Sequence, residues 1–224
     1  MARRRLPNLR RSALKVAPKR KFFLFCEGKN TEPDYFHALK KLFGGVLIDI
    51  EPVGGDPKAV VDSAISCAES RGLCKGGQRR KRNSFELLDE VWAVFDKDVH
   101  AHFQQAIQRC CEKSIGVARS NPCFEVWLIL HFQEFERPDD RHAVQKLLKT
   151  ICPQYDPEKG KTLDHEDALT RLDAAEARAA RQLSKREQEG DAFGPPSTTV
   201  FELTKKIKEA NRRNVQAPSA KANQ

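Results

Sequence analysis

Short apolar segments alternate with longer amphipathic ones along the first 135 residues of the chain. The run Lys21–Cys26 is apolar at every position after the lysine, which is typical of a strand buried on both faces of a sheet. Three further short segments are also rich in apolar residues, so the predicted strands are 21–26, 46–50, 88–95 and 115–118. Helical spacing of apolar residues predicts helices that begin at Thr31, at Pro57, near Ala101 and after Asn121.

This alternation predicts the α/β class. Strand–helix–strand units over 21–135 favour right-handed crossovers and a parallel sheet covered by helices on both faces. Asn121 is expected to cap the helix that follows it, with Pro122 at the first helical position. We therefore divide the chain into a basic flexible arm (1–20), an α/β domain (21–135) and a helical C-terminal extension (136–224).

Beyond Pro138 the apolar pattern is helical only. A single helix is predicted over 164–189, closed by Gly190. A last helix is predicted to open with a capping box formed by Thr199 and Glu202.

The formal net charge of +9 comes from the start of the chain. Nine basic residues and no acidic residue lie within 1–21, so the rest of the chain is electrically balanced. A basic arm on a neutral body suits sequence-independent contact with nucleic-acid phosphates. Two other interpretations stay open: a solvated tail, and an organelle presequence, which Pro7 and Pro18 disfavour.

Composition and cysteine usage indicate the compartment. The chain is 39% hydrophobic and 32% charged, which is enough for a core, and no stretch approaches the ~20 apolar residues that span a bilayer. Its start lacks the apolar segment of a secretory signal. Seven scattered cysteines without a Cys-x-x-Cys motif disfavour a zinc knuckle or a thioredoxin-like site. We expect a soluble protein of the reducing cytoplasm, with no membrane partner.

Three acidic residues directly follow two of the predicted strands: Glu27 after the first, and Asp96 and Asp98 after the third. Functional groups gather beyond the carboxyl ends of parallel strands, so these acids are expected at one edge of the sheet. Asp96 and Asp98 point to the same side if the chain is extended there. Carboxylate oxygens are the ligands that Mg²⁺ prefers, so the set predicts a divalent-metal site. The alternative is that the acids are solvated or cap helices.

Two other known motifs, the P-loop and the phosphatase motif Asp-x-Asp-x-Thr, match this sequence less well. The turn 28–30 is not a P-loop, because Phe23 stands where the first glycine is required and Asn30 replaces the serine or threonine. The segment 96–100 resembles the Asp-x-Asp-x-Thr motif of aspartate-nucleophile phosphatases. In that family the motif usually follows the first strand and has no histidine at the position of His100, so it is a distant alternative.

Basic residues of the glycine-rich stretch 72–83 form a second candidate contact for nucleic acid. The candidates are Arg79, Arg80, Lys81 and Arg82, together with Lys97 beside the acidic pair. A run of charge is also typical of a solvated loop.

A strand followed by Glu-Gly, with Asp-x-Asp after the third strand, resembles the Toprim domain of topoisomerases, primases and OLD-type nucleases. Longer segments resemble the RloB-like proteins more closely. These segments are Phe25-Cys-Glu-Gly-Lys-Asn-Thr-Glu-Pro-Asp-Tyr-Phe36, Phe95-Asp-Lys-Asp98, Ser120-Asn-Pro-Cys-Phe-Glu-Val-Trp-Leu-Ile-Leu-His-Phe132 and Pro195-Pro-Ser-Thr-Thr-Val200. The resemblance spans about residues 20–210 and implies a Toprim-like parallel sheet flanked by helices, with a C-terminal helical extension.

The resemblance also implies a nuclease subunit of bacterial anti-phage defence, often encoded near an ATPase or restriction genes. By carry-over, Glu27 is expected to be a general acid/base or metal ligand, with Asp96 and Asp98 holding Mg²⁺ or Mn²⁺. Glu125 is expected to be a second-metal or orienting carboxylate, although an acid in the first turn of a helix also matches the helix dipole. His131, which lies in an apolar stripe, is expected to be a core histidine.

Two functions are compatible with these residues. The first is a metal-dependent nuclease acting on DNA or RNA with an ATPase partner, since the chain has no P-loop of its own. The second is a non-catalytic subunit that binds nucleic acid or a nucleotide within a defence complex. A homo-oligomer is compatible with either. A topoisomerase or primase is disfavoured, because Tyr35 and Tyr155 lack a nucleophile context and the chain is short for a strand-passage gate.

Overall fold

The computed structural model describes residues 19–74, 88–97, 102–156 and 163–216. Within these ranges one sheet has the strand order β2-β1-β3-β4-β5. Its strands are β1 (Lys21–Cys26), β2 (Leu47–Pro52), β3 (Glu90–Asp96), β4 (Gly116–Asn121) and β5 (Ser197–Thr198). The first four are parallel, and β5 is antiparallel to β4. The predicted α/β class and the parallel arrangement of the sheet are confirmed.

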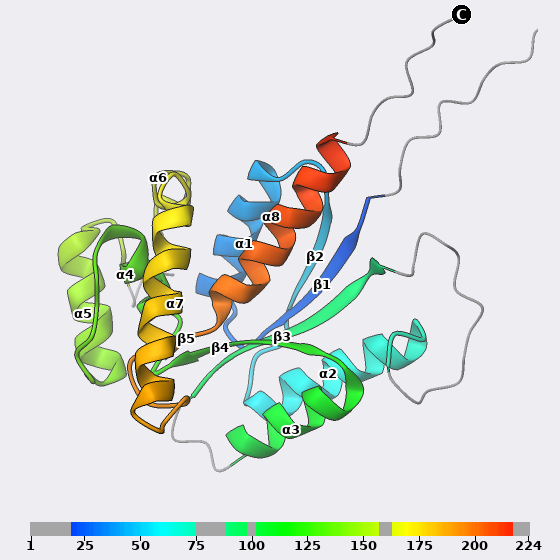
Figure 1. Cartoon of the computed structure of the whole chain (residues 1–224), viewed down its shortest axis with the longest axis horizontal. Helices are drawn as coiled ribbons and strands as arrows, with labels where there is room; N and C mark the ends of the chain where they lie inside the picture. Colours follow the sequence, from blue (N-terminus) through cyan, green and yellow to red (C-terminus); the bar gives the residue numbers. More distant parts are fainter. Residues whose placement is uncertain (1–18, 75–87, 98–101, 157–162, 217–224) are drawn as a thin grey trace, which may run out of the picture.

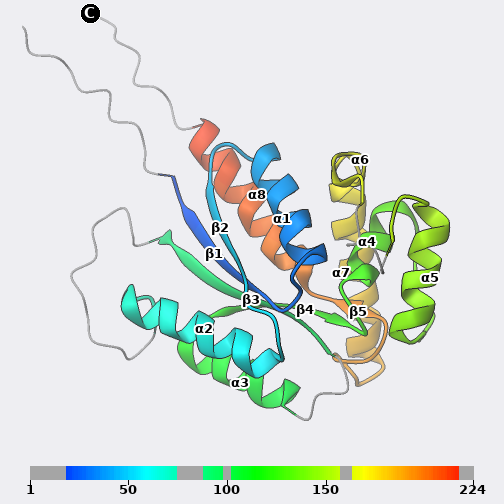
Figure 2. The same ribbon diagram turned by 180° about the vertical axis from the view of Figure 1, so that it is seen from behind.

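Helices cover both faces of the sheet. One face carries α1 (Thr31–Leu42) and α8 (Val200–Gln216), and the other carries α2 (Pro57–Ser70) and α3 (Phe103–Lys113) (Figures 1 and 2). Alternate residues of β1 enter the two resulting cores: Phe22 and Leu24 face one, and Phe23 and Phe25 face the other. This double burial explains why β1 is apolar without alternation.

The remaining helices form a group beside β4 and β5 (Figure 1). They are α4 (Glu125–Phe132), α5 (Arg141–Ile151), α6 (His165–Leu169) and α7 (Leu172–Gln188). In α4 every residue from Glu125 to His131 is buried, because α5, α6 and α7 all pack against it. The C-terminal part of the chain is therefore continuous with the core that covers one face of the sheet.

The end of β4 corrects the predicted start of the helix that follows Asn121. Asn121 is the last residue of β4 and pairs with Ser197 of β5, rather than capping the following helix. Its side-chain amide donates to the carbonyl oxygen of Phe193 at 2.6 Å, and α4 begins only at Glu125. The prediction missed β5, whose two residues carry no strand pattern of their own, so it missed the reason for extending β4.

The C-terminal helices also differ from prediction. The segment 164–189 contains two helices, because the chain turns at Thr170 and Arg171 between α6 and α7. Asp164 begins α6 by accepting hydrogen bonds from the backbone N–H groups of two of its residues. The expected capping box at α8 is wrong as well. The Thr199 hydroxyl instead accepts from the N–H of Arg119 and donates to the carbonyl of Val117, which attaches the start of α8 to β4.

Three further points concern the helices, the cysteines and the start of the chain. None of the helices within the described ranges has the length and apolar character needed to cross a bilayer. All seven cysteines lie in those ranges and are free thiols. The predicted basic arm, apart from Lys19 and Arg20, lies outside the described residues.

His131 is a core histidine, as the sequence predicts. Its Nδ1 lies 3.0 Å from the carbonyl oxygen of Trp127 and its Nε2 lies 3.3 Å from the hydroxyl of Tyr35. A carbonyl can only accept, so Nδ1 carries the proton and Nε2 accepts from Tyr35. Burial lowers the pKa of His131 to about 4, and the folded protein therefore keeps this ring neutral.

We expect the free energy of unfolding to fall as the pH is lowered from 7 to 5. Unfolded His131 takes up a proton near its ordinary pKa of about 6.5, whereas the folded ring resists protonation until about pH 4. This difference removes about 2 kcal/mol of stability over the pH window. Urea unfolding of the wild type and of His131→Gln measures it, and the variant should show the smaller pH dependence. His37→Gln, on the exposed side of α1, is the control; an effect equal to that of His131→Gln would contradict the assignment.

Candidate functional site

Glu27 and Asp96 meet where β1 and β3 end. The N–H of Glu27 donates to the carbonyl of Val94 at 2.9 Å, which continues the pairing of the two strands. The Glu27 side chain then turns across to β3, where its Oε2 accepts from the backbone N–H of Asp96 at 3.0 Å. Both acids therefore lie at the same carboxyl edge of the sheet, where ligands of parallel α/β sheets generally bind.

Glu125 enters the same region from the first turn of α4. Its Oε1 accepts from the Tyr155 hydroxyl at 2.6 Å and from the side-chain amide of Gln145 at 3.3 Å. Burial and the nearby Glu125 carboxyl raise the pKa of Tyr155, so the phenol remains a donor at neutral pH. Glu125 thus has a specific set of donors, in addition to its position at a helix N-terminus.

The start of α5 provides the cation beside Asp96. Arg141 Nη2 lies 3.0 Å from Asp96 Oδ2, and Asp96 is only 7% exposed. Asp140 caps α5 by accepting from the N–H of Ala143, which fixes Arg141 as the first residue of the helix. Gln145 follows one turn later on the same side of α5. One helix face therefore contacts both Asp96 and Glu125.

These groups line a cavity of about 190 Å³. Its acidic residues are Glu27, Glu32, Asp96 and Glu125, and its basic residues are Lys29 and Arg141. Glu32, in the first turn of α1, is 5% exposed, and its carboxylate lies directly over Gly28. Any side chain at position 28 would overlap that carboxylate, so this glycine admits Glu32 to the cavity.

The crowding of acids has a clear electrostatic consequence at Asp96. Burial raises the pKa of its carboxyl well above the usual range, and the negative charges of Glu32 and Glu125 raise it further. Arg141 opposes this rise, while Glu27 adds to it. A buried acid surrounded by other acids needs a compensating cation to stay ionised. Strong perturbation of this kind in a cavity is typical of functional sites.

The donors of the cavity suit a hard divalent cation in kind, since Mg²⁺ and Mn²⁺ prefer carboxylate oxygens. Among the described residues, however, no three histidine, cysteine, aspartate or glutamate side chains converge closely enough to hold a metal ion. Arg141 lies against one oxygen of Asp96, and the predicted ligand Asp98 lies outside the described residues. The chemistry of the cavity therefore fits the cation, while the described side chains are arranged around an arginine.

Comparison with protein families matches the RloB-like proteins over residues 22–207. The chain belongs to the RloB-like protein family. Comparisons with curated proteins and with solved structures gave no match. The matched range contains the sheet except for Lys21, the four acids of the cavity, and Arg141 and Tyr155.

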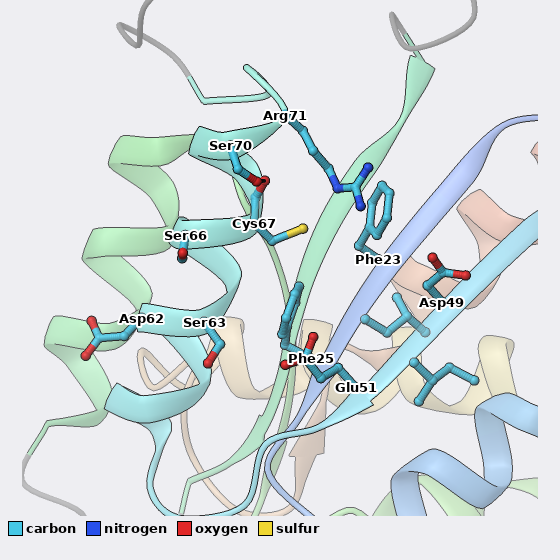
Figure 3. Close-up of a pocket in the computed structure, with 12 residues that line it drawn as sticks. Phe23, Phe25, Asp49, Glu51, Asp62, Ser63, Ser66, Cys67, Ser70 and Arg71 are labelled. Carbon is cyan, nitrogen blue, oxygen red and sulfur yellow. Dashed lines mark hydrogen bonds between the residues drawn. The ribbon is translucent and has the colours of Figure 1, made fainter.

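A larger cavity of about 570 Å³ lies between α2 and the strands β1 and β2 (Figure 3). It also contains acids, and two of them form ion pairs: Asp49 pairs with Lys21 at 2.5 Å, and Asp62 pairs with Arg109 at 2.6 Å. The hydrogen bond from Arg109 lowers the pKa of Asp62, the opposite of the shift at Asp96. The smaller cavity is the better candidate site, because it holds a buried acid whose pKa is strongly raised, and such groups cluster at functional sites.

Of the predicted nucleic-acid contacts, Lys97 is the one that the structure describes. Lys97 directs its ammonium group to the carbonyl of Phe193 at 2.9 Å and lies 5.9 Å from the centre of the Phe103 ring. Arg79, Arg80, Lys81 and Arg82 lie outside the described residues.

The sequence analysis did not identify four residues of the acidic cavity or its contacts: Glu32, Arg141, Gln145 and Tyr155. Glu32 follows Glu27 by five positions, but it resembles an ordinary first-turn acid of a helix. Arg141 and Gln145 had a weak signal, since Asp140 is a good N-cap and fixes which face of the next helix they share. Tyr155 carries no local signal, because its partner is 30 residues away.

We expect Tyr155→Phe to destabilise the protein by about 1–3 kcal/mol, because it removes a donor from the buried carboxyl of Glu125. Urea unfolding at pH 7 measures the loss. A double-mutant cycle with Glu125→Gln should give a coupling energy of about 1 kcal/mol or more. If the two substitutions are strictly additive, the hydrogen bond does not contribute to stability as described.

Proposed function

We propose that this RloB-like protein is a metal-dependent nuclease that hydrolyses phosphodiester bonds of DNA or RNA. The observation that carries the proposal is the acidic cavity at the ends of β1 and β3. Four carboxyl groups line it, and burial together with the other three raises the pKa of Asp96. Such a group of acids is costly for the fold, and a divalent cation would relieve their mutual repulsion.

The proposed roles of Glu27, Asp96 and Glu125 follow from how their side chains are held, and that of Asp98 follows from its place in the sequence. Glu27, Asp96 and Asp98 are the proposed catalytic and metal-binding acids, with Glu125 as a further ligand or orienting carboxylate. A bound Mg²⁺ or Mn²⁺ supplies Lewis acidity to the phosphodiester and lowers the pKa of water. The backbone N–H of Asp96 fixes the Glu27 carboxylate at the edge of the cavity, where it is proposed to accept a proton from water or to bind the cation. Tyr155 and Gln145 fix Glu125 in the same way.

The nucleic acid is proposed to be bound through its backbone. The basic residues within 1–21, Arg79–Arg82 and Lys97 offer sequence-independent attraction for phosphates. Family membership and the resemblance to Toprim nucleases support a role in bacterial phage defence, in the cytoplasm. Because the sequence contains no P-loop, any ATP hydrolysis in the pathway is assigned to a separate ATPase partner.

A second candidate is a non-catalytic subunit that binds nucleic acid or a nucleotide. The observation in its favour is the pair formed by Arg141 and Asp96, since an arginine in the cavity neutralises one acid without a metal. In this alternative the acids are structural, and the chemistry belongs to a partner protein.

We expect Glu27→Gln and Asp96→Asn each to reduce cleavage by at least about a hundredfold, because each removes a proposed ligand or proton acceptor. The assay uses DNA and total RNA with Mg²⁺ or Mn²⁺, with and without any ATPase encoded beside the protein. Mn²⁺ should also raise the melting temperature of the wild type and should raise it less in Asp96→Asn.

Asp49→Asn is the matched control for this assay. Asp49 is also a strand acid, but its side chain is 53% exposed, and it lies in the larger cavity, paired with Lys21. The control should cleave like the wild type. If the wild type binds nucleic acid yet cleaves neither substrate with any metal or partner, the binding subunit becomes the better assignment. Equal cleavage by all three variants would mean that the nuclease site lies elsewhere.

A further inference from the structure

Arg141 occupies a special position relative to Asp96. Its Nη2 lies 3.0 Å from Oδ2 of Asp96, in a cavity that three other acids also line. The two ends of the pair differ in exposure: 34% of the Arg141 side chain is exposed, compared with 10% of the Asp96 side chain. The arginine therefore reaches into the cavity from its open side, while the aspartate forms part of the wall.

We propose that Arg141 takes the place of the divalent cation beside Asp96 in the metal-free protein and binds a phosphate oxygen of the nucleic acid once the cation is bound. This inference rests on the proposed nuclease function. It adds a substrate-positioning role for Arg141 and a reason why the acidic cavity is stable without metal.

Arg141 and a divalent cation would compete for one carboxylate, that of Asp96. Arg141 Nη2 contacts Oδ2 of Asp96, which a cation bound by Asp96 would also approach. Two positive groups in van der Waals contact repel each other strongly in a buried setting, so the arginine and the cation compete for this oxygen. Arg141 is the partner that can move, because about a third of its long, flexible side chain is exposed, whereas Asp96 belongs to β3.

Once a cation displaces it from Asp96, the guanidinium group of Arg141 would bind a phosphate oxygen of the nucleic acid. Arginine binds phosphate through a planar pair of N–H donors, which gives it geometric selectivity that lysine lacks. Arg141 is also the first residue of α5, and the first turn of that helix contains no acidic residue. The positive end of the helix dipole therefore adds to the attraction for an anion at the mouth of the cavity.

A purely structural role for the pair is disfavoured by how α5 is anchored. Val144 and Leu148 of α5 are fully buried in the core, and Asp140 caps the helix through the N–H of Ala143. The helix thus keeps its place through contacts that do not involve Arg141. Substitution of this arginine should leave the fold intact, so that its effects on metal and substrate can be measured separately.

The first test is direct binding of Mn²⁺ to the full chain by isothermal titration calorimetry. We expect Arg141→Met to bind Mn²⁺ at least about fivefold more tightly than the wild type, because the competing cation is removed. Arg141→Lys, which keeps the charge, should stay close to the wild type. Arg137→Met is the control. Arg137 lies four residues before Arg141, its side chain is 65% exposed, and it pairs with Asp139, so its substitution should not change the Mn²⁺ affinity.

The second test measures the phosphate contact without cleavage, using Ca²⁺ and a labelled single-stranded DNA of mixed sequence. The logarithm of the binding constant should depend less steeply on the logarithm of salt concentration in Arg141→Met, by about 0.7 for one lost phosphate contact on single strands. A residue with only a structural role would not change this slope. In the cleavage assay the same variant should raise KM by about tenfold or more, with a smaller effect on kcat.

The outcomes separate the two proposals. If the wild type binds Mn²⁺ and cleaves, but Arg141→Met has the same Mn²⁺ affinity and the same salt dependence, the role of Arg141 is overturned and the nuclease stands. Weaker Mn²⁺ binding by a folded Arg141→Met would also overturn it, because the arginine would then support the cation rather than replace it. If the wild type neither binds Mn²⁺ nor cleaves, both proposals fail together.

Discussion

The parallel pairing of β1 with β3 is the interaction on which the site depends. Its register sets Cys26 against Val94, so Glu27 follows β1 beside Phe95, one residue before Asp96 at the end of β3. Glu27 therefore finds the N–H of Asp96 as a donor, and the two acids approach without any loop needing to bring them together. A shift of one residue would turn the side chains of one strand to the opposite face. The apolar residues on both faces of β1 oppose that shift, so the core that stabilises the sheet also positions the acids.

The second constraint is that negative charge buried near Asp96 must be compensated. In the larger cavity Asp49 and Asp62 each pair with a cation of their own, and the pKa of Asp62 is lowered as a result. Among the described residues that line the cavity at the ends of β1 and β3, four are acids and two are cations, and the pKa of Asp96 rises. A fold that needed only stability would gain from replacing some of these acids, since buried charges are costly unless paired. Their retention in one small cavity is the physical reason for assigning function to it.

Much of the sheet could be predicted from the sequence, because buried parallel strands and amphipathic helices leave strong local patterns. Glu27 and Asp96 could be predicted for the same reason, since strand ends in such a sheet converge on one edge. The missed features depend on pairing between distant segments. β5 is two residues long and exists through β4, and Asn121 is a strand residue only because Ser197 lies opposite it. Likewise, no local pattern links Arg141 or Tyr155 to acids that precede them by 45 and 30 residues.

These long-range contacts change how the C-terminal half of the chain should be understood. The hydrophobic pattern alone suggests an α/β unit followed by a helical appendage. In the structure, residues beyond position 136 add β5 to the sheet, cover one of its faces with α8, and supply Arg141, Gln145 and Tyr155 to the acidic cavity. The acids come from one part of the chain, and most of the groups that neutralise or orient them come from the other. A site divided in this way forms only when both parts are folded together, so the charge balance of the cavity also reports on the integrity of the whole fold.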